Sequence, residues 1–141
     1  MLFGDLLIEE NYRHTGFRVL QHEAEGTRVE ISWAGEWKGS GPLAGVEGTD
    51  RGTVTGILRT DGVANPLQGN GVFITKDGQI LSYSSHGISL PEGSDRRRAR
   101  YLYLFRATSP KYEWLKTTCL IWEDTDDLTR QEGHSKGYQW K

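Results

Sequence analysis

The sequence predicts an all-β protein, an eight-stranded antiparallel up-and-down closed barrel with one short helical turn. Three turn signals, Glu25-Gly26, Asp61-Gly62 and Asp77-Gly78, each separate two stretches of alternating side chains. Such dipeptides are strong hairpin signals, because Gly adopts the positive φ that tight hairpin turns need. The composition agrees, since 18 Gly, 5 Trp and 6 Tyr beside a hydrophobic content of 35% are more typical of a twisted, aromatic-lined sheet than of a helical bundle.

The length of 141 residues suits a single domain covering 1–141, in which we expect 1–15 to form a flexible lead before the first strand. The formal net charge of −2 gives no general attraction to nucleic acid or anionic lipid. Cys119 is the single cysteine, so no intrachain disulfide supports an oxidising compartment. No apolar run approaches the roughly 20 residues of a membrane helix, and the start lacks the layout of a signal peptide. We therefore expect a cytoplasmic protein without a nucleic-acid or membrane partner.

The first two strands are expected at 17–23 and 28–37, joined across Glu25-Gly26-Thr27. In the second run the apolar residues and a Gly share one face while charged residues dominate the other, as a half-buried strand requires. The apolar face consists of Val29, Ile31, Trp33, Gly35 and Trp37. A glycine-rich connection at 39–48 follows.

Further strands are expected at 53–60, 67–75 and 79–90, and the Asp61-Gly62 and Asp77-Gly78 turns join them into one contiguous sheet. The inward phase of 67–75 stays open, because both of its faces carry apolar residues. One candidate inner face holds Gln68, Asn70, Val72 and Ile74, and the other holds Leu67, Gly69, Gly71, Phe73 and Thr75.

The strongest β run is 98–108, in which Tyr101, Tyr103 and Phe105 alternate with Leu102 and Leu104. Both faces are thus partly apolar, and the outer one makes a homodimer plausible. Ser109-Pro110 then predicts the start of a helical turn, because Pro suits the first helical position. The remaining elements follow in order: the helical turn at 111–116, a strand at 118–123, a turn at 124–127 and a closing strand at 133–140.

The lengths of the links favour a barrel over a sandwich. A Greek-key sandwich needs long returns that place strands out of order, whereas only the links at 39–48 and 109–117 are long here. Short links throughout the rest of the chain are typical of an up-and-down barrel, and closure removes exposed sheet edges. A barrel of about eight strands is just wide enough to be filled by side chains or to hold one small ligand.

Four stretches resemble a family of small uncharacterised bacterial β-barrel proteins of lipocalin- and streptavidin-like shape, related to the allene oxide cyclase barrel. These stretches are Trp37-Lys-Gly-Ser-Gly41, Asn70-Gly-Val-Phe-Ile-Thr-Lys-Asp-Gly78, Arg106-Ala-Thr-Ser109 with Leu115 shortly after, and Tyr138-Gln-Trp-Lys141. The resemblance implies a short closed barrel. It implies no catalytic residue, because the matching positions are mainly turn and packing residues.

Three residues are candidates for catalysis: His86, Tyr83 and Arg100. An imidazole exchanges protons near neutral pH, so His86 could act as a proton shuttle with Tyr83 nearby on the same strand. The alternative for His86 is a hydrogen-bonded structural residue near a barrel rim. Arg100 precedes the aromatic run, where a guanidinium could grip a carboxylate with two parallel hydrogen bonds. The neighbouring arginine cluster 96–98 is instead typical of a solvated turn.

The candidate ligand-binding residues are Trp33, Trp37, Gln68, Asn70 and Tyr103. The aromatic side chains would provide flat apolar walls, as small-molecule sites generally have, although in a small barrel they could equally fill the core. If their face points inward, Gln68 and Asn70 would hold a carbonyl or hydroxyl group of the ligand.

No motif indicates a metal or another cofactor. The acidic run from Asp124 to Asp127 lacks the glycine and the closing glutamate of a calcium loop. We therefore expect a barrel that binds a small hydrophobic or aromatic molecule in its interior. The alternative is a cofactor-free cyclase or isomerase acting on a flexible polyene, polyketide or fatty-acid-derived substrate, because holding reacting atoms in place lowers a barrier without a strong nucleophile.

Overall fold

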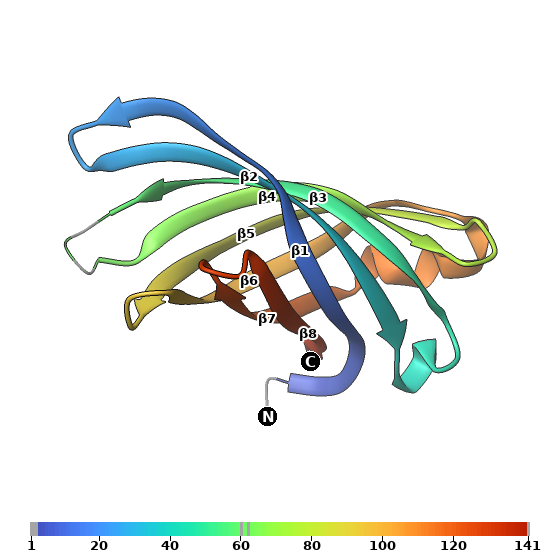
Figure 1. The fold of residues 1–141 in the computed structure, drawn as a ribbon. Helices are drawn as coiled ribbons and strands as arrows, with labels where there is room; N and C mark the ends of the chain where they lie inside the picture. The colour runs from blue at the N-terminus through green and yellow to red at the C-terminus, as the bar shows by residue number, and fades with distance from the viewer. Residues whose placement is uncertain (1–2, 60, 62, 141) are drawn as a thin grey trace.

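Eight antiparallel strands form one closed barrel in which each strand pairs with its sequence neighbours and the last returns to the first (Figure 1). The computed structural model describes residues 3–59, 61 and 63–140. The strands are β1 (Phe3–Glu23), β2 (Gly26–Gly39), β3 (Glu47–Leu58), β4 (Asn65–Thr75), β5 (Ile80–Glu92), β6 (Arg96–Thr108), β7 (Cys119–Asp127) and β8 (Glu132–Trp140). Two 3-10 helices, η1 (Gly41–Leu43) and η2 (Pro110–Thr117), occupy the two long links. The predicted closed up-and-down barrel is confirmed.

Turn and cap chemistry explains much of this order. Gly78 adopts a φ of 85° in the β4–β5 hairpin, a conformation that favours glycine. Pro110 opens η2 at the expected place. Thr60, at the end of an expected strand, and Gly62, in an expected turn, lie outside the described residues.

The expected flexible lead at 1–15 is wrong for the part that the structure describes, because β1 begins at Phe3. This strand pairs with both β2 and β8 and so closes the barrel. Its inner face carries Glu10, Tyr12 and His14, so the alternation of polar and apolar residues that marks a strand is absent from this stretch of the sequence.

The expected turn at 124–127 is also wrong. β7 continues to Asp127, and Asp126 pairs with Gly133 of β8. The misassignment has the same cause, since Asp124 and Asp126 are acidic residues on an inner face. The cluster 96–98 likewise begins β6 and does not form a turn of its own.

The phase of β4 places Asn65, Leu67, Gly69, Gly71, Phe73 and Thr75 inward. Gly71 is needed on this face because a Cβ there would lie 2.3 Å from the Tyr83 hydroxyl oxygen. Gln68 and Asn70 consequently point outward and are exposed.

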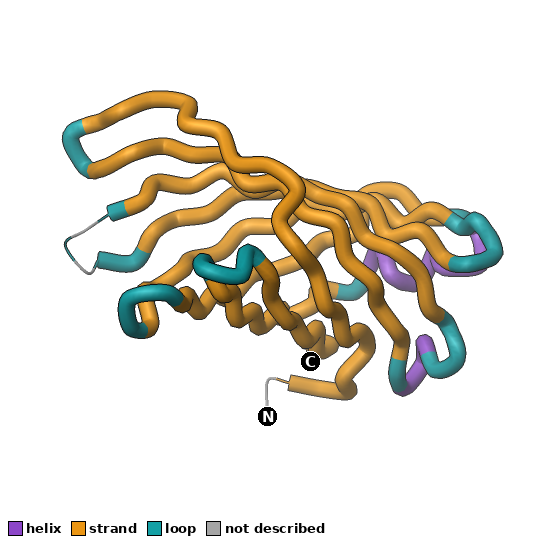
Figure 2. The backbone as a smooth tube through the Cα atoms, viewed as in Figure 1, coloured by secondary structure: helices purple, strands orange, loops and turns teal. Residues whose placement is uncertain are grey.

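One half of the barrel is filled by side chains. Aromatic rings stack across it, with centroid distances of 4.8 Å for Phe73 and Tyr83, 4.5 Å for Tyr83 and Tyr103, and 4.4 Å for Tyr103 and Trp122. Leu43 of η1 and Leu115 of η2 are buried against this cluster. Both helices lie at the end of the barrel opposite the β1–β2 and β5–β6 hairpin tips (Figure 2). Among the described residues, no helix has the length and hydropathy to cross a membrane.

Candidate functional site

The other half of the barrel encloses a cavity of about 540 Å³. Its floor is formed by Tyr103 and Trp122, the last rings of the aromatic stack, and Leu58 and Leu128 lie near its mouth. The walls are largely apolar and include Val29, Ile31, Trp33, Val54, Leu67 and Tyr101. Such a volume, with apolar walls and a few polar groups, is typical of small-molecule sites.

Several small inward residues leave this half of the barrel less filled. Gly56, Ser89 and Ala99 occupy inner positions here, whereas Phe73, Tyr83 and Phe105 occupy them in the filled half.

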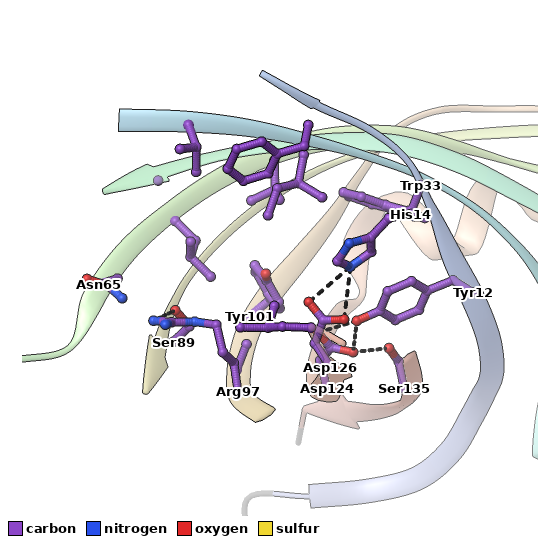
Figure 3. Close-up of a pocket in the computed structure, with 18 of the residues that line it drawn as sticks. Tyr12, His14, Trp33, Asn65, Ser89, Arg97, Tyr101, Asp124, Asp126 and Ser135 are labelled. Carbon is purple, nitrogen blue, oxygen red and sulfur yellow. Dashed lines mark hydrogen bonds and ion pairs between the residues drawn. The ribbon is translucent and has the colours of Figure 1, made fainter. Parts of the chain in front are cut away.

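Asp124 is the centre of a polar group on one side of the cavity (Figure 3). The Tyr12 hydroxyl donates to its Oδ1 and Oδ2 at 2.8 and 2.9 Å. The Ser135 hydroxyl donates to Oδ1 at 2.8 Å. Tyr12 of β1 is the cross-strand partner of Gly133 of β8. A Cβ at position 133 would come within 2.3 Å of the Tyr12 ring and hydroxyl. The hydrogen bond between Tyr12 and Asp124 therefore requires a glycine at position 133.

Burial raises the pKa of Asp124 from its ordinary value of 3.8 to about 7, and the neighbouring Asp126 carboxylate also raises it. The hydrogen bonds from Tyr12 and Ser135 act in the opposite direction, because they stabilise the charged form. Asp124 is thus present both as acid and as carboxylate near neutral pH, the condition for exchanging a proton with a bound molecule.

His14 and Asp126 are hydrogen-bonded beside this group, with Nε2 at 2.9 and 3.1 Å from the two carboxylate oxygens. Both side chains are almost enclosed, with exposures of 10% and 14%. The His14 ring stacks on Tyr12 with an interplanar angle of 11°. The pair therefore extends the polar side of the cavity from Asp124 along β1 and β7.

A second carboxyl pair, Glu10 and Asp50, lies next to the Trp33 indole. Asp50 accepts hydrogen bonds from Trp33 Nε1 and from the Tyr83 hydroxyl, both at 2.9 Å. Burial and the nearby Asp50 charge raise the pKa of Glu10 well above its usual range. Burial also raises the pKa of Asp50, against the hydrogen bonds that it accepts. Asp50 thus orients the indole that forms the cavity wall.

Arg97, Ser89 and Asn65 form a second polar group of the cavity, on β6, β5 and β4. It adjoins the first group, because Arg97 is the cross-strand partner of Asp126. Arg97 Nη2 donates to Ser89 Oγ at 3.0 Å. Burial lowers the pKa of Arg97, although a guanidinium stays charged in proteins.

The residues expected from the sequence are divided between the cavity, the packed core and the outer surface. Trp33 and Tyr103 line the cavity. Tyr83 and Trp37 are buried in the filled half, where Trp37 Nε1 donates to the Thr49 carbonyl oxygen at 3.0 Å.

The remaining four expected site residues, Gln68, Asn70, His86 and Arg100, lie on the outer face. The reason is strand alternation, which turns each of them away from its inward neighbours. Gln68 and His86 are cross-strand partners there, and Arg100 pairs with Glu123 at 3.1 Å. A role for these four residues inside the cavity is therefore wrong.

Sequence reasoning missed most of the polar cavity residues. A signal for them was present, since Glu10, Tyr12 and His14, and likewise Asp124 and Asp126, recur at spacing two. In a strand this spacing places side chains on one face. Within the part of the chain that the structure describes, no group of three or more His, Cys, Asp and Glu side chains could hold a metal ion.

No protein-family model matches the chain, and no curated protein matches it either. Solved structures do resemble it. A protein of unknown function from Clostridium acetobutylicum is 18% identical over 97% of this chain and 98% of its own, with a TM-score of 0.76. A beta-barrel like protein from Acinetobacter baumannii is 15% identical over 97% of this chain and 94% of its own, with a TM-score of 0.76.

An enzyme from Penicillium herquei is more distant, at 15% identity over 95% of this chain and 92% of its own, with a TM-score of 0.57. At these identities the likeness concerns the fold. The chain shares its barrel fold with these bacterial structures, of which the one from Clostridium acetobutylicum is a protein of unknown function.

Proposed function

We propose that the protein binds a small, mainly hydrophobic or aromatic molecule inside the barrel. The observation that carries this proposal is the cavity of about 540 Å³, with apolar walls and two polar groups. Apolar walls supply affinity, and a few fixed polar groups orient the ligand. Trp33 is fixed at the wall, because its indole nitrogen donates a hydrogen bond to Asp50.

A neutral fluorescent probe, N-phenyl-1-naphthylamine, tests this proposal without knowledge of the natural ligand. Val54→Phe adds volume at a cavity wall, and we expect it to weaken probe binding by at least about tenfold. The matched control is Leu102→Phe, which adds a ring at an exposed position of the outer face and should leave binding unchanged. Circular dichroism checks the fold of both variants. Equal binding by all three proteins would contradict a site in the cavity.

Native mass spectrometry of the protein purified from its own host would then identify the molecule. A co-purifying small molecule that Val54→Phe excludes is the expected result.

A cofactor-free isomerase or cyclase is the second candidate function, favoured by Asp124 beside Tyr12 at the cavity surface. Asp124 as carboxylate would accept a proton from a substrate atom, and as acid it would return one to another atom. The substrate would be a flexible polyene, polyketide or fatty-acid-derived molecule that the apolar walls hold in a reactive conformation.

Hydrogen–deuterium exchange of 2-tetralone in D₂O, followed by proton NMR, tests this second candidate. We expect the wild type to accelerate exchange at the carbon beside the ketone, and Asp124→Asn to abolish the acceleration. The control Glu123→Gln changes the adjacent carboxylate, which pairs with Arg100 at the barrel surface, and should exchange like the wild type. An unaltered rate in Asp124→Asn would exclude this role for Asp124.

A further inference from the structure

Asn65, Ser89 and Arg97 lie next to one another across three strands. Asn65 and Ser89 are direct cross-strand partners on β4 and β5, and Ser89 accepts a hydrogen bond from Arg97 of β6. All three line the cavity. In Figure 3 they lie on the side away from Tyr12, His14 and Ser135, and Arg97 extends toward Ser89.

Arg97 differs from the other arginines at the start of β6. The outward Arg96, Arg98 and Arg100 pair with Asp127, Glu92 and Glu123 at 4.0, 3.3 and 3.1 Å. Arg97 points inward, and among the described residues no carboxylate oxygen lies within 4.0 Å of its nitrogens. A guanidinium carries five N–H donors, of which the bond to Ser89 uses one. Arg97 thus offers a positive charge and free donors to the cavity.

Asn65 gives an independent indication of a ligand. Its side chain is only 1% exposed. Neither Oδ1 nor Nδ2 has a hydrogen-bond partner among the described residues. Buried polar atoms without partners are uncommon and costly in folded proteins. An amide that lines a cavity in this state is best explained by a polar group that the ligand supplies.

The acidic residues of the cavity are already engaged. Asp126 is paired with His14, and Asp124 accepts hydrogen bonds from Tyr12 and Ser135. Arg97 is the cross-strand partner of Asp126, but its side chain extends toward Ser89. The cavity therefore has an acidic side on β1, β7 and β8 that adjoins a donor-rich side on β4, β5 and β6. An anionic group would be repelled by the first side and held by the second.

We propose that the ligand ends in a carboxylate, which Arg97, Ser89 and Asn65 hold while the apolar body lies against Trp33 and Tyr101. This inference rests on the proposed function, because it concerns a molecule bound in the same cavity. Charge-assisted hydrogen bonds from a guanidinium are the stronger kind, and two parallel ones also fix orientation.

Two probes of nearly equal size and shape test this subsite: 2-naphthylacetate and its amide, 2-naphthylacetamide. In isothermal titration calorimetry of the wild type, we expect the carboxylate to bind at least about tenfold more tightly than the amide. Arg97→Gln should remove this preference, with the affinity for the amide changing by less than about twofold. Arg100→Gln removes a neighbouring positive charge from the outer face and should keep the preference.

Asn65→Leu separates binding from folding. Leucine keeps the branched shape of asparagine, its larger methyl groups can extend into the cavity, and it has no unpaired polar atoms. The free protein should therefore be at least as stable as the wild type in urea denaturation. Carboxylate binding should nevertheless weaken by several fold. Loss of stability together with unchanged binding would show that Asn65 has a structural role and would overturn its place in the subsite.

The outcomes distinguish this inference from the proposed function. Binding of both probes with equal affinity would overturn the carboxylate subsite and leave the apolar site intact. If Arg97→Gln still bound the carboxylate more tightly than the amide, the carboxylate subsite would likewise be overturned and the apolar site would remain. If the wild type bound none of the three compounds, neither the two naphthyl probes nor N-phenyl-1-naphthylamine, both proposals would be overturned.

Discussion

The Tyr12 hydroxyl donates to both carboxylate oxygens of Asp124, at 2.8 and 2.9 Å, across 112 positions of the chain. The contact depends on barrel closure, because β1 pairs with β8 and β8 pairs with β7. Gly133 lies opposite Tyr12 on β8, and its missing side chain leaves room for the phenol. The polar side of the cavity is therefore assembled from both ends of the sequence.

Removing the Tyr12 hydroxyl should make Asp124 harder to ionise. We expect Tyr12→Phe to move the pKa of Asp124 upward from about 7, because the lost hydrogen bond stabilised the carboxylate. Carboxyl carbon shifts in a ¹³C NMR titration measure this directly. Tyr138→Phe, on a ring that stacks on Phe3, is the control and should leave the titration unchanged. A lower pKa in Tyr12→Phe would refute the assigned hydrogen-bond effect.

Asp124→Asn should change how stability depends on pH. The pKa of Asp124 is about 7 in the fold against an ordinary 3.8, so its stabilising contribution is complete below pH 3.8 and is lost as pH rises through 7. Asparagine does not ionise. The variant should therefore gain stability relative to the wild type between about pH 4 and pH 8, by up to about 4 kcal/mol.

Urea denaturation at several pH values measures this difference. Glu123→Gln, on the outward side chain next to Asp124 in sequence, serves as the control and should follow the wild type closely. A stability difference between Asp124→Asn and the wild type that stays constant with pH would refute the raised pKa.

A methyl group at Gly133 should disrupt the acidic side of the cavity. The added Cβ would lie 2.3 Å from the Tyr12 hydroxyl oxygen and 2.7 Å from the Thr125 carbonyl oxygen, and the backbone atom cannot swing away. We expect Gly133→Ala to cost about 1–3 kcal/mol in chemical denaturation. Gly16→Ala meets its nearest atoms at 3.7 Å and should cost clearly less. Equal losses in the two variants would contradict this steric account.

Trp37 and Trp33 should have different effects when truncated. Trp37 is 2% exposed and meets the edge of Phe73 with a centroid distance of 5.5 Å, so Trp37→Ala should lower the free energy of unfolding by about 3–5 kcal/mol. Trp33 is half-buried at the cavity wall. Trp33→Ala should lower the unfolding free energy less and weaken binding of N-phenyl-1-naphthylamine more. Denaturation and fluorescence titration compare the two variants, and the reverse pattern would contradict their assignment to core and wall.

The order of strands could be predicted because its signals are local. Gly78 marks its turn through its own backbone freedom, and Pro110 marks the start of η2. The apolar alternation that includes Val29 and Trp37 likewise identified β2 and its buried face. Each of these signals acts over a few residues and requires no distant contact.

The functional site could not be predicted in the same way, because its side chains contradict the usual polarity of strand faces. Polar inward residues concealed β1 and the end of β7, and both faces of β4 were compatible with burial, so Gln68 and Asn70 seemed as suitable as Leu67 and Phe73. The sequence by itself determined the closed meander, through turn chemistry and alternation. Only the tertiary structure decided which side chains meet in the cavity, because Tyr12 reaches Asp124 and Arg97 reaches Ser89 through strand registers that closure of the whole barrel sets.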